Sequence, residues 1–302
     1  MRDIKVVCAK QIRIEGRHVR VARLEADKYQ FVDDPERMLE GLQRCGTRVD
    51  LFTFMQRPPE TTPLYRYPME WDNLAVLPVT TFEEWWNKQI GFKARNKAKQ
   101  AEKKGVVIRE VPFSDQLVKE IWAIYNETPV RQGRSFPHYG KDVDTVYAEE
   151  ATFLESSVFL GAYLGERLIG FIKLVSDETG TQAGLMNIMS LIEQRDKAPT
   201  NALVAHAVKA CAERGIRYLV YSNFAYGKKE RDTLSDFKER NAFARMDLPR
   251  FYVPLTWRGQ LYLRLGLHRR MVDLLPAPVA GRLREYRNAW NNRKLQAMAE
   301  SS

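Results

Sequence analysis

A polar and aromatic stretch between residues 125 and 141 holds the side chains best suited to chemistry. Arg131 and Arg134 can clamp a carboxylate or a phosphate, because a planar guanidinium forms paired hydrogen bonds with such oxygens. Glu127 and His138 can each accept a proton from an amine. The stretch therefore predicts a pocket that holds an anionic substrate and deprotonates it.

The same stretch has a plainer interpretation, a surface loop with solvated arginines and aromatic side chains packed on the core. We favour the pocket, because loops this rich in polar and aromatic residues often carry function. Asn126 and Tyr139 are then expected to contact the substrate.

Two asparagines lie where predicted strands run or end. Asn187 lies within a strand at Leu185–Ile192, and Asn223 directly follows a strand at Tyr218–Ser222. Such an amide can orient a reacting carbonyl, or it can be a buried group bonded to neighbouring backbone. Both interpretations stay open.

These residues need a scaffold, and the chain alternates helix and strand patterns from residue 82 to residue 256. One helix is expected over Phe82–Lys104, with acids early, bases late and Gly105 at its end. A strand pair is expected around Gly165 and Glu166. The predicted fold class is α/β (α+β), with a mixed central sheet flanked by helices.

The chain of 302 residues is long enough for a large core without disulfides. We expect a strand-rich region over 1–80 with a hairpin at Gly16-Arg17, a main domain over 81–256 and a basic helical tail over 257–302. The final strand of the main domain is expected at Phe251–Leu255.

The net charge of +10 first suggests a binder of polyanions. Residues 92–105 carry +5 and residues 257–302 carry +6, whereas the rest carries −1. The helix with these bases can be a solvated face or can guide tRNA. The leucines and arginines of the tail can pack on the domain or lie on an anionic membrane surface.

The three cysteines are far apart in the sequence, and no apolar leader is present, so we expect a cytoplasmic protein. No residues have the spacing of metal ligands, so we expect no bound metal. No nucleophile elbow and no Cys/His signature is present, so a covalent acyl-enzyme has little support.

Three segments in order resemble the Fem-type peptidoglycan aminoacyltransferases, and through them the wider GNAT-like N-acyltransferases. Residues 95–106 resemble a basic helix that ends in Lys-x-Gly-Val, and residues 199–216 resemble the helix before a core strand. Residues 234–243 resemble the Phe-Lys motif near the end of that domain. The resemblance implies a GNAT-like sheet, with residues 1–80 as a shortened first acyltransferase half.

The resemblance also implies roles for single residues. Tyr226 follows the last core strand, where GNAT enzymes commonly place the tyrosine that protonates the leaving thiolate. The cosubstrate loop reads Glu193 to Asn201 and lacks the glycines usual in coenzyme A users, which puts tight coenzyme A binding in doubt. The donor-binding residues expected near this loop are Lys197, Thr200, Asn201 and Asn223.

The resemblance therefore predicts direct transfer of an acyl group from acyl-CoA, or of an aminoacyl group from aminoacyl-tRNA, to a small-molecule or peptide amine. The alternative is a silent scaffold of the same fold that binds nucleic acid or an anionic membrane through its basic segments.

Overall fold

The structure is a computed structural model, and it describes residues 2–131, 134–225 and 233–269. Its centre is one eleven-stranded sheet in the order β1-β2-β3-β4-β13-β5-β12-β11-β10-β9-β6. The strands of this sheet and of a separate small pair are Arg2–Val7 (β1), Lys10–Glu15 (β2), Val21–Leu24 (β3), Leu51–Met55 (β4), Met69–Pro78 (β5), Val106–Val111 (β6), Val130–Arg131 (β7), Arg134–Ser135 (β8), Ser157–Leu164 (β9), Arg167–Ser176 (β10), Gln182–Ser190 (β11), Tyr218–Val220 (β12) and Ala244–Pro254 (β13).

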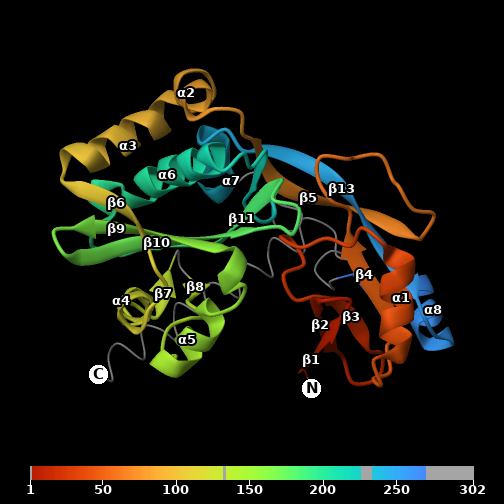
Figure 1. Ribbon diagram of the computed structural model, residues 1–302. Coiled ribbons are helices and arrows are strands. Elements are labelled where there is room, and N and C mark those ends of the chain that lie inside the picture. Colours follow the sequence, from red (N-terminus) through yellow and green to blue (C-terminus); the bar gives the residue numbers. More distant parts are fainter. Residues whose placement is uncertain (1, 132–133, 226–232, 270–302) are drawn as a thin grey trace.

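Helices cover both faces of this sheet, as Figure 1 shows. The α-helices are Pro35–Arg44 (α1), Phe82–Glu84 (α2), Phe92–Lys103 (α3), Asp115–Tyr125 (α4), Val143–Glu150 (α5), Pro199–Glu213 (α6), Thr233–Arg240 (α7) and Trp257–Arg264 (α8). Around the part of the sheet built by β6 and β9–β11, α3 and α6 lie on one side, and α4 and α5 lie on the other (Figure 1). This confirms the predicted mixed sheet flanked by helices.

One strand from the N-terminal region is built into the middle of the sheet. β5 pairs with β12 through Val76 and Val220, and with β13 through Ala75 and Arg245. Residues 1–80 therefore share one sheet with the main domain, and the predicted boundary near residue 80 directly follows this shared strand.

The helix expected over Phe82–Lys104 is wrong in one respect, because the chain breaks it near Gly91. A π-helical turn over Trp85–Gln89 ends there, and α3 begins at Phe92. The N–H of Gly91 donates to the carbonyl of Arg240 at 2.8 Å, and a Cβ on Gly91 would lie 3.1 Å from that oxygen. The close approach to the end of α7 is what turns the chain.

Two other boundaries differ from the sequence-based expectation. β2 and β3 do pair, but Glu15 lies opposite Val21, so residues 16–20 form a longer loop than a two-residue turn. The final strand starts at Ala244, seven residues before the predicted start, because its first half pairs with β5.

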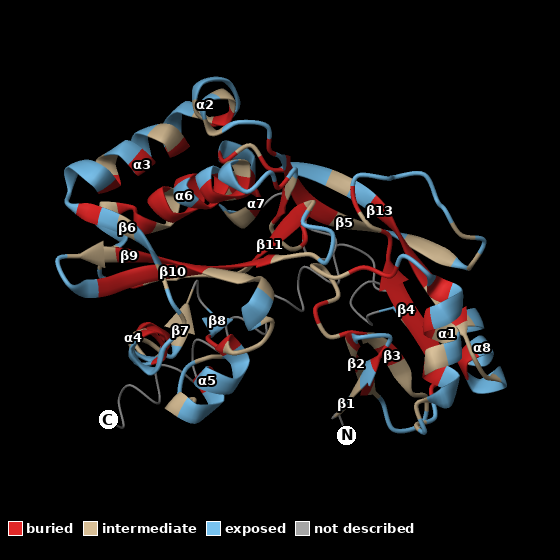
Figure 2. Cartoon of the chain, viewed as in Figure 1, coloured by how far each residue is buried: buried red, intermediate tan, exposed pale blue. Residues whose placement is uncertain are grey.

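The core consists of a large cluster around β9–β11, α4 and α6 and smaller clusters at the N-terminal half. Figure 2 shows α6 and β4 as mostly buried and the outer side of α3 as exposed. On β4, Phe52 and Phe54 pack with the apolar side of α1, whereas Leu51 and Thr53 face the opposite side of the sheet, where a cavity lies.

The structure describes all of the basic segment at 92–105 and residues 257–269 of the second basic segment. On α3 the lysines point to solvent, while Ala94, Ala98 and Ala101 are buried. Along α8 and just after it, Trp257, Leu261 and Leu265 are exposed, so the first interpretation, packing on the domain, is not seen for these two leucines, whereas Leu263 is half-buried. Residues 270–302 of the predicted tail lie outside the described residues. Within the described ranges, no helix is long and apolar enough to cross a membrane.

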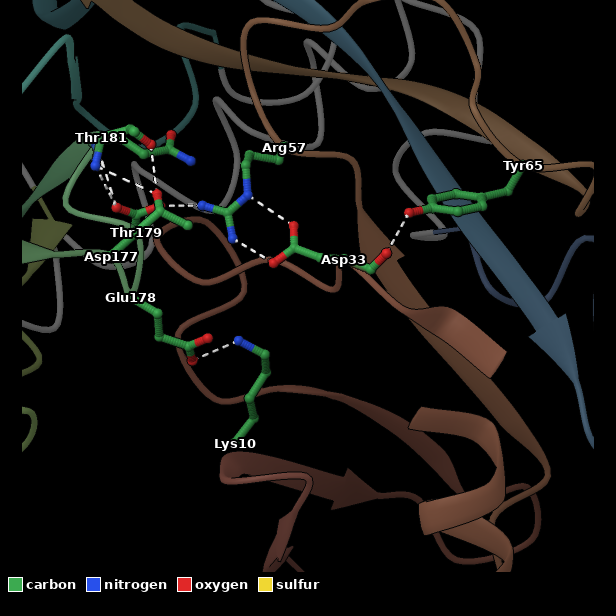
Figure 3. Close-up of polar contacts among 9 residues, drawn as sticks. Lys10, Asp33, Arg57, Tyr65, Asp177, Glu178, Thr179 and Thr181 are labelled. Carbon is green, nitrogen blue, oxygen red and sulfur yellow. Dashed lines mark hydrogen bonds and ion pairs between the residues drawn. The ribbon is translucent and has the colours of Figure 1, made fainter. Parts of the chain in front are cut away.

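Polar contacts tie the N-terminal region to the turn between β10 and β11 (Figure 3). Arg57 donates to both oxygens of Asp33, at 2.9 and 2.8 Å, and also to Asp177. Lys10 donates to Glu178 at 2.6 Å. Asp177 also accepts the N–H of Thr181 at 3.0 Å. The carboxylate that binds the Arg57 guanidinium therefore also stabilises the turn between β10 and β11.

Candidate active site

β11 and β12 part after a short parallel pairing. Only Gln182, Ala183 and Gly184 of β11 pair with β12, and from there to Ser190 β11 pairs with β10 but not with β12. The pairing of β11 with β10 shifts by one residue at Met186, which bulges out of the ladder. A bulge re-aims side chains and increases local twist. The two strands thus open a gap beside Met186.

A tyrosine from the N-terminal region closes one side of this gap. The Tyr29 hydroxyl donates to the carbonyl of Leu185 at 3.0 Å. Its ring lies so close to Gly184 that a Cβ there would stand 2.1 Å from a ring carbon. Glycine is needed at this point of β11 because the ring crosses directly over the backbone.

A cavity of about 960 Å³ lies beside the gap. Met186 and Asn223 line its end at the diverging strands, and Arg13, Arg23 and Thr53 line its end in the N-terminal half. A volume of this size suits a small-molecule ligand. The cavity is therefore built jointly by the main domain and by residues 1–80.

Among the described residues, Asn223 is the predicted site residue that lines this cavity. Its amide nitrogen donates to Asp72 at 2.9 Å and to the carbonyl of Asn73 at 2.8 Å. Its amide oxygen accepts from Lys28, and its backbone carbonyl accepts from the buried Lys238. These contacts fix the amide at the end of β12 against the N-terminal region.

Arg250 holds the cavity wall together between two carboxylates. It donates to Asp72 at 2.9 Å and lies 2.9 Å from Asp27, and its side chain is only 10% exposed. Burial by itself lowers the pKa of Arg250, but the two carboxylates outweigh this and raise it. The guanidinium is thus permanently charged and fixes the loop at Asp27 over the sheet.

The loop predicted as a substrate clamp is tied to the end of β11. The Glu127 carboxylate accepts the N–H groups of Ile192 and Glu193 at 2.8 and 3.0 Å. Arg131 donates to Glu127 at 3.0 Å and to the carbonyl of Ser190 at 2.8 Å. Glu127 and Arg131 are thus brought together, and their contacts join the loop to the segment that leads into α6.

The remaining residues of that loop lie nearer the surface. Asn126 caps the end of α4 and accepts the N–H of Gly140 at 2.9 Å. Arg134 is exposed on β8, and Tyr139 is 45% exposed. The predicted roles of these side chains in substrate binding stay predictions.

Replacement of Glu127 by glutamine should lower the free energy of unfolding by about 2 kcal/mol, because one amide oxygen cannot replace a carboxylate that serves two N–H groups and a guanidinium. Chemical denaturation followed by circular dichroism measures the change. Glu155→Gln, at an exposed position, should change stability by less than about 0.5 kcal/mol. Equal losses in both variants would contradict the anchoring role.

Three of the four predicted donor-binding residues, Lys197, Thr200 and Asn201, lie at the start of α6, whereas Asn223 lies in the cavity. Thr200 lies with its hydroxyl 3.1 Å from that of Ser190, and Lys197 lies 3.5 Å from Asp196. The backbone N–H of Asn201 donates to the carbonyl of Ala198 at 3.1 Å. Tyr226, the predicted general acid, lies outside the described residues.

A buried polar centre lies beneath β10 and β11, and most of its residues were not predicted from the sequence. One oxygen of Glu150 accepts from the Tyr125 hydroxyl at 2.8 Å and from the Asn187 amide at 2.7 Å. Lys173 donates to the carbonyls of Glu150 and Thr152, both at 2.6 Å, and so caps the end of α5. Asn187 is thus the link from this centre to β11.

The charges in this centre are shifted by their surroundings. Burial raises the pKa of Glu150 and lowers the pKa of Lys173 to about 8. His138 stacks on Tyr125 with ring centroids 4.4 Å apart, and burial together with Lys141 lowers its pKa. A histidine that is neutral over a wider pH range keeps its capacity to accept a proton.

Sequence signals for the missed residues existed but were weak. Lys173 is the one charged residue inside the apolar strand Leu168–Val175, which marks it as a buried lysine with a partner. Arg23, Thr53 and Arg250 carry no such signal, because their meeting depends on which strands pair. Among the described residues, no cluster of three or more His, Cys, Asp or Glu side chains could hold a metal.

No protein-family model and no curated protein matches this sequence. Solved structures do match. The C-terminal domain of a protein described as a lysylphosphatidylglycerol synthetase from Agrobacterium fabrum has 13% identity and a TM-score of 0.55, with 87% of each chain covered.

Two further structures have the same architecture. L-PGS from Bacillus licheniformis has 15% identity and a TM-score of 0.55, covering 89% of this chain and 90% of its own. FemX has 12% identity and a TM-score of 0.52, covering 84% and 86%. At these identities the likeness is one of fold, and the chain therefore has the GNAT-like fold of the Fem-type aminoacyltransferases.

Proposed function

We propose that this protein is a transferase that moves an aminoacyl group from aminoacyl-tRNA directly to an amine. The amine nitrogen attacks the ester carbonyl, the new C–N bond forms, and the C–O bond to the tRNA ribose breaks. The amine gives up a proton to a base, and the leaving ribose oxygen takes one up. No covalent intermediate on the protein is required.

The gap between β11 and β12 beside the 960 Å³ cavity is the observation that carries this proposal. Strand ends that diverge in this fold can hold a reacting carbonyl between them. The amide of Asn223, fixed by Asp72 and Asn73, then faces the same cavity as a bound acceptor. Tyr226 follows within three residues and remains the candidate that protonates the leaving oxygen.

The loop before α6 favours tRNA over coenzyme A as the carrier of the donor. A pyrophosphate there would need free backbone N–H groups, and those of Ile192 and Glu193 already donate to Glu127. The Glu127 carboxylate would also repel a pyrophosphate at that place. Glycines, which would let a phosphate approach the backbone, are absent from residues 191–201.

The exposed face of α3 offers a surface for the tRNA phosphates. Lys93 and Lys99 are exposed there, and the buried alanines of α3 leave this basic face to solvent. Contacts of this kind release counterions and make binding strongly salt-dependent. α3 lies on the side of the sheet that also carries α6 and the loop that leads into it (Figure 1).

The test compares thermal unfolding with coenzyme A, acetyl-coenzyme A, aminoacylated tRNA and deacylated tRNA. Aminoacylated tRNA at about 100 times its dissociation constant should stabilise the protein by about 2.7 kcal/mol. Lys93→Gln combined with Lys99→Gln should reduce the salt dependence of binding, whereas Lys119→Gln, on the opposite side of the sheet, should not. Transfer of a radiolabelled amino acid to a pool of small amines then measures activity.

If acetyl-coenzyme A were the only compound that stabilised the protein, the carrier of the donor group would be coenzyme A and not tRNA. If none of the four compounds stabilised the protein and no label moved, the transferase proposal would be wrong.

A further inference from the structure

Four residues directly opposite one another form a row across the N-terminal half of the sheet. Arg13 on β2 pairs in register with Arg23 on β3, Arg23 with Thr53 on β4, and Thr53 with Tyr252 on β13. All four line the 960 Å³ cavity. One wall of the cavity therefore carries two arginines, a threonine and a tyrosine side by side.

This row is electrostatically unfavourable as it stands. Like charges directly opposite on neighbouring strands destabilise a sheet. The Nε atoms of Arg13 and Arg23 and the hydroxyl oxygen of Thr53 are buried and have no hydrogen-bond partner. A buried donor without a partner is costly. The Nε of Arg13 at least lies 3.4 Å from Glu25, so the Nε of Arg23 and the Thr53 hydroxyl are the two that need a reason other than stability.

The acidic side chains of the cavity supply an ion-pair partner for Arg13 but none for Arg23. Asp27 and Asp72 both form ion pairs with Arg250, and Glu70 forms an ion pair with Arg269 at 2.6 Å. Glu25 lies 3.4 Å from Arg13 and balances that charge. Arg23 has no ion-pair partner within the described ranges, and it lines the cavity.

We infer that the Arg23–Thr53 end of the cavity binds an oxyanion, a carboxylate or a phosphate group, carried by the acceptor substrate. The forked donors of an arginine suit either group. The link to the acceptor rests on the proposed function, whereas binding of the anion itself does not.

The position of this subsite also limits the shape of the acceptor. β3 and β12 are separated by four steps in the strand order. At about 4.8 Å a step, Arg23 lies roughly 19 Å along the sheet from the end of β12 where Asn223 stands. An acceptor that reaches both ends is therefore an extended molecule with an amine at one end and an acid at the other.

The test measures anion binding without any turnover. Inorganic phosphate and acetate are titrated into the full chain at constant ionic strength, with sodium chloride as the reference, and thermal unfolding is recorded. Phosphate or acetate should raise the Tm above the chloride reference. Arg23→Gln should weaken the binding about tenfold or more, and Arg23→Lys should weaken it less because the charge remains.

The control is Arg245→Gln, an exposed arginine on β13 that pairs with Asp247 and lies outside this cavity. It should bind the anion as the wild type does. Without anion, Arg23→Gln should have the same Tm as the wild type or a higher one, because it removes a charge without a partner; a structural arginine would give a lower one.

A response to phosphate alone, to acetate alone or to both supports the subsite and tells which group it takes. The inference is overturned if neither anion raises the Tm beyond chloride, or if Arg23→Gln responds as the wild type does. Anion binding without any transfer of label would instead overturn the proposed function alone.

Discussion

Replacement of Arg250 by methionine is expected to lower the free energy of unfolding by about 3–5 kcal/mol. The guanidinium is the shared partner of Asp27 and Asp72 in a largely buried place. Without it, two carboxylates lie close together with reduced access to water. Breaking a buried ion cluster by removing one partner costs far more than the cluster contributes as a whole.

Urea denaturation followed by tryptophan fluorescence measures this loss. Arg245→Met, on the same strand but with an exposed ion pair, should cost less than about 1 kcal/mol. Adding Asp27→Asn and Asp72→Asn to Arg250→Met should recover most of the loss. If the triple variant is as unstable as the single one, the loss comes from packing and not from the unpaired charges.

Wild-type stability should rise by about 2 kcal/mol between about pH 7.5 and about pH 10 through Lys173 alone. Burial lowers the pKa of this lysine to about 8, against 10.5 for an ordinary lysine. Between these two values the unfolded chain binds a proton at this position that the folded chain does not. Stability therefore increases with pH across this window.

Lys173→Met should abolish this increment, although it also leaves the carbonyls of Glu150 and Thr152 without their donor. Lys99→Gln, at an exposed position on α3, should retain it. Urea denaturation at a series of pH values gives the slopes. Parallel curves for the wild type and Lys173→Met would show that the lysine is charged in the folded state throughout this range.

The sequence predicted best those elements that depend on neighbouring residues. The pair of β9 and β10 lies where a strand pair was expected around Gly165 and Glu166, and α6 lies within residues 199–216, where the resemblance implied a helix. The break at Gly91 could not be predicted in this way, because it depends on the carbonyl of Arg240 far along the chain.

The residues of the candidate site differ in the same way, because only some of their positions can be inferred from neighbouring residues. Asn187 and Asn223 were recognised because each stands on or after a predicted strand. The cavity wall was not, because Arg13, Arg23 and Thr53 meet only through the register of three strands. Register is set by pairing partners and turn geometry, and neither can be inferred from one sequence when the partners are distant.

The place of β5 has a consequence for how the chain can acquire its structure. A ribosome makes β5 early, yet its two partners β12 and β13 emerge only after most of the main domain has been made. Pairings between such distant segments slow folding, because a long loop must close before they stabilise anything. β5 therefore cannot gain its two partners until long after its own synthesis, and the cavity can exist only once residues up to Arg269 have left the ribosome.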